Sequence, residues 1–344
     1  MERVGVLTGG GDCPGLNAVI RGLVRKAARH NISIVGIKNG WKGLVSIDTM
    51  DLDLSSVADI VGKGGTILGT SRTNPYKNKE DVKKVIDNYK KLKLDALVAI
   101  GGEDTLGVAN KLVKENAGVN VVGVPKTIDN DLNATDYTFG FDTAVNVAME
   151  AMDRLHTTAE SHHRVMVCEI MGRHAGWIAI HSGLAAGAGV ILIPEVPIDL
   201  DEVCEILKKS HDGGRLFSIV AVAEGAEFKE GQVVTQKKEL DAFGHCILGG
   251  IGDRLAEEIE KRTKLETRST VLGHIQRGGS PTAFDRVLGT RFGVKAMELV
   301  LDKKFGCMVS LAGTEIKEVP IAEAVGTLKT VDKKFYEMAK IFFG

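Results

Sequence analysis

The sequence lacks the features that would place it in several special classes of protein. No apolar run approaches the roughly 18 residues that a bilayer-spanning helix needs. The formal net charge of the 344 residues is only −1, so no overall basic character attracts nucleic acid or an anionic membrane. The first residues, MERVGVLTGG, are too short and too rich in glycine for a signal peptide. We expect them to form a buried first strand.

Cysteine is scarce and scattered. The chain has 5 cysteines, an odd number, and no CxxC pair. This usage favours a reduced compartment, with structural thiols and no zinc site. We therefore expect a cytoplasmic protein. Because the net charge is close to zero, any anionic ligand must bind to positive groups placed locally.

Glycine, in contrast, is abundant, with 41 residues, and much of it follows short apolar runs that alternate with amphipathic stretches. The apolar runs predict strands at residues 4–8, 32–37, 96–100, 119–124, 165–170, 190–193, 216–223 and 269–272. The amphipathic stretches predict helices at residues 16–30, 143–160, 200–210, 251–263 and 283–302, and one from about residue 104. Continuous apolar strands followed by helices indicate an α/β fold with parallel sheets buried on both faces.

The domain boundary has no linker signal. No low-complexity segment separates two halves, and Gly140, between a polar turn and a predicted helix, is the best single candidate. Residues 226–244 are polar and predict a surface loop or hairpin. In parallel sheets, ligands bind at the carboxyl ends of the strands, and most of the polar motifs lie there.

The first motif is the glycine-rich turn of residues 9–15, GGGDCPG, between a strand and a helix. Glycines at such a turn let backbone amides approach a phosphate at the helix N-terminus. Pro14 occupies the third glycine position of the dinucleotide fingerprint, and the turn is no Walker A motif either. A tight strand–helix turn without a ligand remains the alternative.

Two acidic motifs follow later strands. In GGEDT, Glu103 and Asp104 could hold Mg²⁺ with phosphate oxygens, or could simply cap a helix. In PKTIDND, Asp129 and Asp131 suit a general base with a supporting acid, as transfer of a phosphoryl group to a hydroxyl requires. An Asx-rich turn is the alternative for the second motif.

Cationic residues recur in the second half of the chain. Arginine offers bidentate geometry to phosphate, although any single arginine is more often part of a solvated face. The candidates for a sugar-phosphate site are Arg164, Arg173, Arg268, His274 and Arg277.

Together and in this order, the motifs make the chain resemble the phosphofructokinase family from end to end. The segments are GGGDCPGLNAVIRG, GGTILGTSR, GGEDT, PKTIDND, MGRHAGWIA, ETRSTVLGHIQRGGSP and the pair Asp285-Arg286. The resemblance implies a Mg²⁺-dependent transferase, a kinase of glycolysis, with two similar three-layer α/β domains and the active site in the cleft between them. The implied domains are residues 1–140 plus 276–326 for the phosphoryl donor and residues 141–275 plus 327–344 for fructose 6-phosphate. A homotetramer or a homodimer with shared active sites is expected.

The resemblance also implies roles for single residues. Gly11 and Arg72 contact the donor phosphates, and Glu103 replaces the usual magnesium-associated aspartate. Asp129 is the base, with Thr127, Asp131 and the catalytic Arg173 near it. The residues expected to hold the fructose ring are Met171, Gly172, Arg173 and Glu224. Those expected to bind the 6-phosphate are Arg164, Arg268, His274 and Arg277, the first two reaching across from a neighbouring subunit.

Two positions favour pyrophosphate over ATP as the donor. ATP users of the family usually carry glycine where Asp104 and Lys126 stand, and the pair of aspartate and lysine goes with pyrophosphate. A carboxylate beside the nucleotide's α-phosphate adds repulsion on the order of 4 kcal/mol at about 4 Å and an effective dielectric of about 20. An ATP-dependent 6-phosphofructokinase is the nearest alternative, and a non-catalytic sugar-phosphate sensor a more distant one. A dehydrogenase is excluded by Pro14 and by Lys38 and Asn39, which stand where a ribose-binding acid would be.

Overall fold

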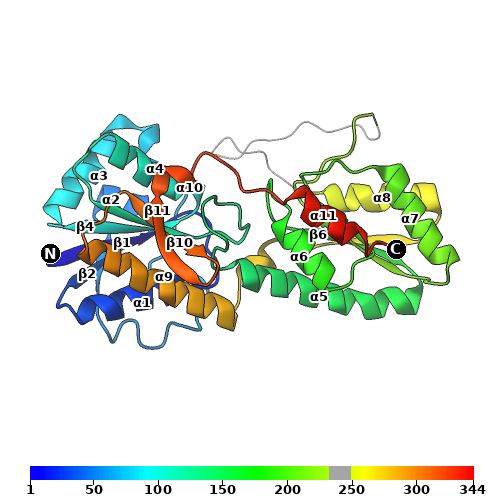
Figure 1. Cartoon of the computed structure of the whole chain (residues 1–344), viewed down its shortest axis with the longest axis horizontal. Helices are drawn as coiled ribbons and strands as arrows, with labels where there is room; N and C mark the ends of the chain where they lie inside the picture. The colour runs from blue at the N-terminus through cyan, green and yellow to red at the C-terminus, as the bar shows by residue number, and fades with distance from the viewer. Residues whose placement is uncertain (232–248) are drawn as a thin grey trace. The chain divides into compact units, whose positions relative to one another are not determined.

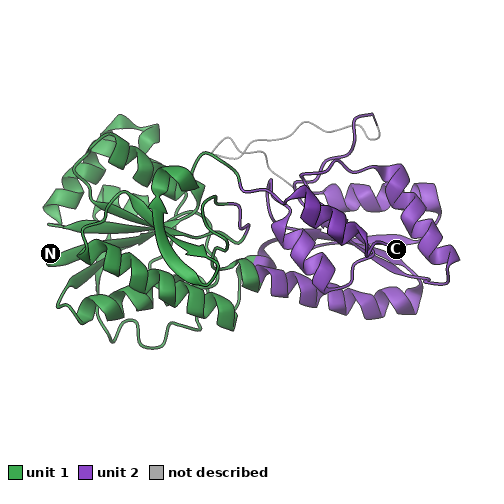
Figure 2. Cartoon of the chain, viewed as in Figure 1, with its two compact units in different colours: residues 1–128, 132–143, 277–328 green, residues 129–131, 144–276, 329–344 purple. Residues whose placement is uncertain are grey.

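The computed structural model of the chain describes residues 1–231 and 249–344 (Figure 1). The chain divides into two compact units, each assembled from three separate segments (Figure 2). Unit 1 comprises residues 1–128, 132–143 and 277–328, and unit 2 comprises residues 129–131, 144–276 and 329–344. Residues 129–131 belong to unit 2 although they lie between two segments of unit 1, and the chain then crosses from unit 1 to unit 2 again at residues 143/144. The sequence placed this crossing at residues 140/141.

Unit 1 is built on a seven-stranded sheet with the order β11-β10-β5-β4-β1-β2-β3. Its five central strands pair in parallel, and the two edge strands, β3 and β11, pair antiparallel to their neighbours. The strands are β1 (Arg3–Thr8), β2 (Ser33–Ile37), β3 (Thr49–Leu52), β4 (Ala96–Gly101), β5 (Val121–Pro125), β10 (Cys307–Ala312) and β11 (Glu315–Pro320).

Helices cover both faces of this sheet. One face packs on α1 (Leu16–Ala28) and α9 (Ala283–Leu301), whose backbones approach closely: a Cβ added to Gly293 would lie 2.1 Å from the Val19 carbonyl oxygen. The other face forms a core cluster with the remaining helices of the unit. These are α2 (Trp41–Ser46), α3 (Lys79–Lys91), α4 (Glu103–Lys114) and α10 (Ile321–Ala324), with a 3-10 turn, η1, at Pro75–Lys77.

Unit 2 has a smaller, fully parallel sheet with the order β7-β8-β6-β9. Its strands are β6 (Val165–Ile170), β7 (Val190–Leu192), β8 (Ser218–Ala223) and β9 (Thr267–Val271). Its helices are α5 (Phe141–His162), α6 (Trp177–Ala185), α7 (Leu200–Asp212), α8 (Ile251–Thr263) and α11 (Lys333–Lys340), and a second 3-10 turn, η2, lies at Gly273–Arg277.

The alternation of side chains along these strands separates two layers of helices. Val220 and Val222 join a core cluster with α7 and α8. Ala221, between them, lies near Gly183 of α6, on the opposite face. The C-terminal helix α11 packs in turn on α6.

The structure confirms the α/β class with mainly parallel sheets. Each of the eight predicted strands has a counterpart, with ends shifted by a few residues, whereas β3, β10 and β11 were not predicted. The predicted loop or hairpin at residues 226–244 falls largely outside the described residues, as does Cys246. Within the described residues, no helix combines the length and apolar character that crossing a bilayer would demand.

Candidate functional site

In unit 1 the predicted donor residues gather at the carboxyl ends of three adjacent strands, β1, β4 and β5. The glycine loop after β1 is held from both neighbours: the Gly9 amide donates to Ile100 O at 2.9 Å, and the Gly10 amide donates to Ser71 O at 3.1 Å. Arg72 is exposed and follows Ser71 directly, so its backbone is fixed beside the loop.

Side chains at Gly9 and Gly11 would collide with their surroundings. A Cβ at Gly9 would lie 2.5 Å from Thr105 Oγ1, and one at Gly11 would lie 2.7 Å from Arg277 Nη1. At Gly9 a side chain would require the Thr105 side chain to move, whereas at Gly11 the contact is with the end of the flexible Arg277 side chain. Arg277 also donates to Asp12 O at 3.3 Å. This structure thus places Arg277 on the glycine loop of unit 1.

Lys126 lies beneath the same loop. The residue is only 4% exposed, its amide donates to Gly101 O at 3.0 Å and its ammonium donates to Gly11 O. Glu103 and Asp104, at the start of α4, are both exposed, and Glu103 Oε1 accepts from the Gly326 amide at 3.3 Å. The buried ammonium of Lys126 therefore contacts the glycine loop, and the exposed carboxylates of Glu103 and Asp104 begin the helix that follows the adjacent strand β4.

The TIDND segment leaves β5 and passes from unit 1 into unit 2 at Asp129. Thr127 and Asp129 are both buried, and the Thr127 carbonyl accepts from Thr138 Oγ1 at 2.7 Å. Asn130 adopts a left-handed φ of 51°, and the carbonyl of Asp131 accepts from the Lys329 amide at 2.9 Å. The segment is therefore a turn held by backbone hydrogen bonds, and it contains the buried carboxylate of Asp129.

In unit 2 the predicted ring-binding residues lie at the carboxyl ends of β6 and β8. Glu224 Oε1 accepts from the amides of Gly172 at 3.3 Å and Arg173 at 3.1 Å. Arg173 has a φ of 52°, which is uncommon for a residue with a side chain and is typical of functional sites. Burial raises the pKa of Glu224, and the Asp129 carboxylate acts in the same direction, while the two amides oppose them.

The predicted phosphate-binding residues do not all lie at the carboxyl ends of the strands. Arg164 immediately precedes β6 and Arg268 is the second residue of β9, and these two strands pair in parallel. Both arginines therefore lie at the amino ends of the strands, and both engage Glu266 Oε1 at 2.7 Å. The six residues of β6 separate Arg164 from Met171, and the seven residue steps of extended strand between them span about 23 Å. His274, by contrast, is exposed in η2, just beyond the carboxyl end of β9.

Several residues with no predicted role support the site. The amide of Met171 donates to Gln276 Oε1 at 3.3 Å, and Gln276 is fully buried. Glu195 accepts from the amides of Gly176 and Val331. Gln276 lies within the quoted motif GHIQRGG and could have been noticed there, whereas Glu195 carries no sequence signal.

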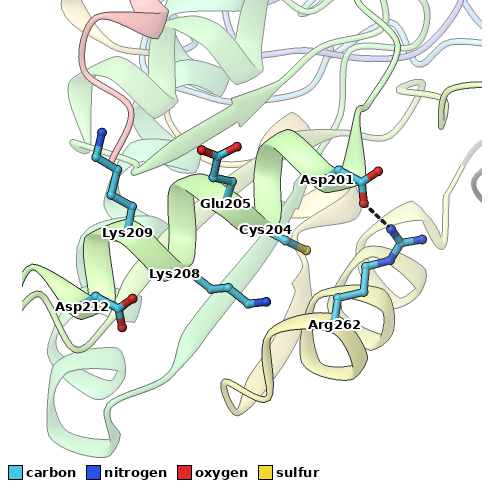
Figure 3. A pocket seen from close by; sticks show the side chains of 7 residues that line it. All are labelled: Asp201, Cys204, Glu205, Lys208, Lys209, Asp212 and Arg262. Atoms are coloured by element: carbon cyan, nitrogen blue, oxygen red, sulfur yellow. Dashed lines mark hydrogen bonds and ion pairs between the residues drawn. The ribbon is translucent and has the colours of Figure 1, made fainter.

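Unit 2 also has a hollow that contains no predicted site residue. An open hollow of about 740 Å³ lies along α7 and is lined by Asp201, Cys204, Glu205, Lys208, Lys209, Asp212 and Arg262 (Figure 3). None of these is a predicted site residue, and Arg262 already pairs with Asp201 at 2.8 Å.

Across residues 1–231 and 249–344, no group of three or more His, Cys, Asp or Glu side chains could enclose a metal ion.

Cys13, in the glycine loop, is not a reactive thiol. It is fully buried, and its Sγ donates to Phe139 O at 3.6 Å. Burial raises the pKa of its thiol to about 12, so the thiolate is negligible near neutral pH. This agrees with the expectation that the thiols are structural.

Comparison with known proteins decides the family. The phosphofructokinase family profile matches residues 3–300. The chain belongs to the phosphofructokinase family. A pyrophosphate–fructose 6-phosphate 1-phosphotransferase of Streptomyces coelicolor is 58% identical over 343 residues, which cover 99% of this chain and the whole of that protein.

Two further relatives bear on the comparison. An ATP-dependent 6-phosphofructokinase 3 of the same species is 51% identical, over 98% of this chain and 99% of that one. Among solved structures, a phosphofructokinase from Saccharomyces cerevisiae superposes with a TM-score of 0.82 and 29% identity. That match covers 99% of this chain and 47% of the yeast chain, so this protein spans about half of the yeast chain's length.

Proposed function

We propose that the protein transfers a phosphoryl group from pyrophosphate to the 1-hydroxyl of fructose 6-phosphate and forms fructose 1,6-bisphosphate. The observation that carries the choice of donor is the buried ammonium of Lys126, which donates to Gly11 O in the glycine loop. A cation fixed there can pair with the terminal phosphate of a small, highly charged donor.

Asp104 favours pyrophosphate because its carboxylate disfavours ATP. It lies exposed in the first turn of α4, where it adds negative charge beside the donor loop. Repulsion of a nucleotide α-phosphate on the order of 4 kcal/mol, if only half realised, would still lower ATP use more than tenfold. The 58% identity with a relative named for pyrophosphate use supports the same choice.

The acceptor chemistry follows from unit 2. Asp129, buried at the turn after β5, accepts the proton of the 1-hydroxyl, with Thr127 and Asp131 beside it. Arg72 and the glycine-loop amides would stabilise the charge that develops on the transferring group and its leaving group, and Arg173 is the further catalytic residue that we propose. Glu224 Oε1 is occupied by two amides, which leaves Oε2 to accept from a ring hydroxyl.

Magnesium fits the residues present. The ion usually takes one or two carboxylates and completes its shell with phosphate oxygens and water, so an enclosed cage of protein ligands is not required. Glu103 is an exposed carboxylate at the start of α4 and is the ligand we propose. Bound there, Mg²⁺ would neutralise charge on the donor phosphates.

The positions of Arg164 and Arg268 in the sheet of unit 2 bear on how subunits assemble. Because both are at the amino ends of β6 and β9, one chain cannot bring them to the Met171 end of its own sheet without unfolding the strands. We propose that they bind the 6-phosphate at a neighbouring subunit's site, in a homotetramer or homodimer. Unit 1 would serve the donor and unit 2 fructose 6-phosphate, in a cytoplasmic enzyme of glycolysis and gluconeogenesis.

One assay tests the donor and the acceptor together. Purified protein receives fructose 6-phosphate and Mg²⁺ with either pyrophosphate or ATP, and fructose 1,6-bisphosphate is measured. We expect a much higher kcat/KM with pyrophosphate, and reversal of the reaction when orthophosphate is supplied. The 51% identity with an ATP-dependent relative makes ATP the alternative donor, and faster turnover with ATP would establish it.

A further inference from the structure

Glu195 lies where three segments of unit 2 meet. Its two carboxylate oxygens accept from the Gly176 amide, which caps α6, at 3.0 and 3.1 Å. Oε1 also accepts from the Val331 amide at 2.8 Å. One carboxylate therefore ties the segment after β7, the start of α6 and the returning C-terminal chain together.

The C-terminal segment of residues 329–331, here called the strap, has two further attachments. The Lys329 amide donates to Asp131 O at 2.9 Å, and the Lys329 carbonyl accepts from Trp177 Nε1 at 2.8 Å. The Lys329 ammonium also lies 5.3 Å from the centre of the Trp177 ring. The strap thus connects the turn that contains Asp129 to the first residue of α6.

The loop of residues 171–176 depends on this arrangement. At the β6 end, Glu224 holds the amides of Gly172 and Arg173. At the α6 end, Glu195 holds Gly176, where a Cβ would lie only 2.4 Å from Ile193 Cβ. Because Arg173 keeps a left-handed φ of 52° between these two anchors, the loop should relax if either anchor is lost.

We propose that Glu195 is a positioning residue for fructose 6-phosphate. It acts through Gly176 and Val331, sets the geometry of the ring-binding loop and, through the strap, steadies the turn of the catalytic base. The inference rests on the proposed function for its substrate. It predicts that loss of Glu195 weakens binding of the sugar phosphate and leaves binding of the donor unchanged.

The kinetic test compares three variants. Glu195→Ala should raise KM for fructose 6-phosphate about tenfold, with KM for pyrophosphate unchanged, since small displacements of positioning groups carry effects of this size. Glu195→Gln keeps one carbonyl oxygen and should recover part of the loss. The matched control is Asp199→Ala, which removes the carboxylate that caps α7 by accepting from Asp201 and Glu202 amides at 3.1 and 3.4 Å. It should leave both KM values unchanged.

A second readout needs no turnover. In a Trp41→Phe background, Trp177 is the remaining tryptophan of the chain's 2, and its emission reports the strap. Glu195→Ala should shift that emission to the red and speed amide hydrogen exchange at residues 171–176. Asp199→Ala should do neither.

The outcomes separate the two proposals. If the wild type forms no fructose 1,6-bisphosphate with either donor, the proposed function fails, and the fluorescence and exchange measurements still decide whether Glu195 orders the loop. If the wild type is active but Glu195→Ala keeps its KM for fructose 6-phosphate, the positioning role is refuted. Equal rises of both KM values, or equal effects of Asp199→Ala, would also refute it by indicating general destabilisation.

Discussion

Asp285 offers the sharpest test of how unit 1 is held together. Its carboxylate is fully buried at the start of α9, and Oδ2 accepts from the Thr143 amide at 2.8 Å and from Thr143 Oγ1 at 2.5 Å. Burial raises the pKa of Asp285 from 3.8 to about 6, and the nearby Asp142 adds to the rise, while these hydrogen bonds and the Gly140 amide oppose it.

The sign and size of the stability effect follow from this pKa. The folded state binds the proton more tightly than the unfolded state, so the contribution is fully present below about pH 3.8 and is lost as pH rises through about 6. A difference of about two units corresponds to about 3 kcal/mol, of which about 1.4 kcal/mol falls between pH 5 and 7.5. Asp285→Asn cannot ionise, so the stability of the wild type relative to this variant should fall by that amount.

The assay is urea unfolding at several pH values, followed by the fluorescence of Trp41, which is buried in unit 1. Both proteins carry Trp177→Phe, so that unit 2 adds no tryptophan signal. Asp95→Asn is the control, because the amides of Glu2 and Arg3 lower the pKa of Asp95. Its contribution is lost only as pH falls below about 4, so its stability should run parallel to the wild type from pH 5 to 7.5. Wild type and Asp285→Asn curves that stay parallel from pH 5 to 7.5 would refute the argument.

Three further predictions concern activity. Asp129→Asn should lower kcat at least about 10²-fold when fructose 1,6-bisphosphate formation from pyrophosphate is measured, and near-normal turnover would exclude Asp129 as the base. Asp104→Gly should raise kcat/KM for ATP by roughly tenfold to a thousandfold, whereas Lys126→Gly should mainly damage pyrophosphate use; no gain with ATP would show that Asp104 does not exclude the nucleotide. Subunits carrying Arg268→Ala and Asp129→Asn should partly restore activity when mixed and reassembled, and verified mixed oligomers without recovery would count against shared sites.

Most of the buried parallel strands were predictable because they are continuous apolar runs. The exception is β10, which reads CMVSLA, is buried at residues 308–311 and pairs in parallel with β5, and which was missed although it has this pattern. β4 reads ALVAIG and is buried at each of its residues, so its pattern is that of a central parallel strand. The edge strand β11 reads EIKEVP and is partly exposed throughout, and β3 reads TMDL. Edge strands face solvent and carry charge, which removes the apolar signal that marks a strand in the sequence.

The glycine loop, the TIDND turn and the loop after β6 could be placed in advance because each follows a strand that the sequence marks clearly. What the sequence alone did not reveal is which backbone groups hold them. Glu195 lies 19 positions from Gly176 and 136 from Val331, and no local pattern links them. Long-range contacts of this kind depend on the packing of α6 and the C-terminal segment on one sheet, which periodicity does not encode.

Three carboxylates in unit 2 bear on how the proposed site for a dianionic sugar phosphate would tolerate negative charge. Glu169 accepts from the amides of Gly250 at 3.2 Å and Gly252 at 2.8 Å, at the start of α8. Glu195 and Glu224 each accept from backbone amides as well. Backbone amides stabilise these charges without using an arginine. Within the part of unit 2 that the structure describes, none of the three carboxylates pairs with the Arg173 guanidinium, which is consistent with the role proposed for it. Each carboxylate instead fixes an irregular stretch of backbone. Because Glu195 binds the amides of Gly176 and Val331, replacing it should alter the geometry of the loop before it alters the charge of the proposed site.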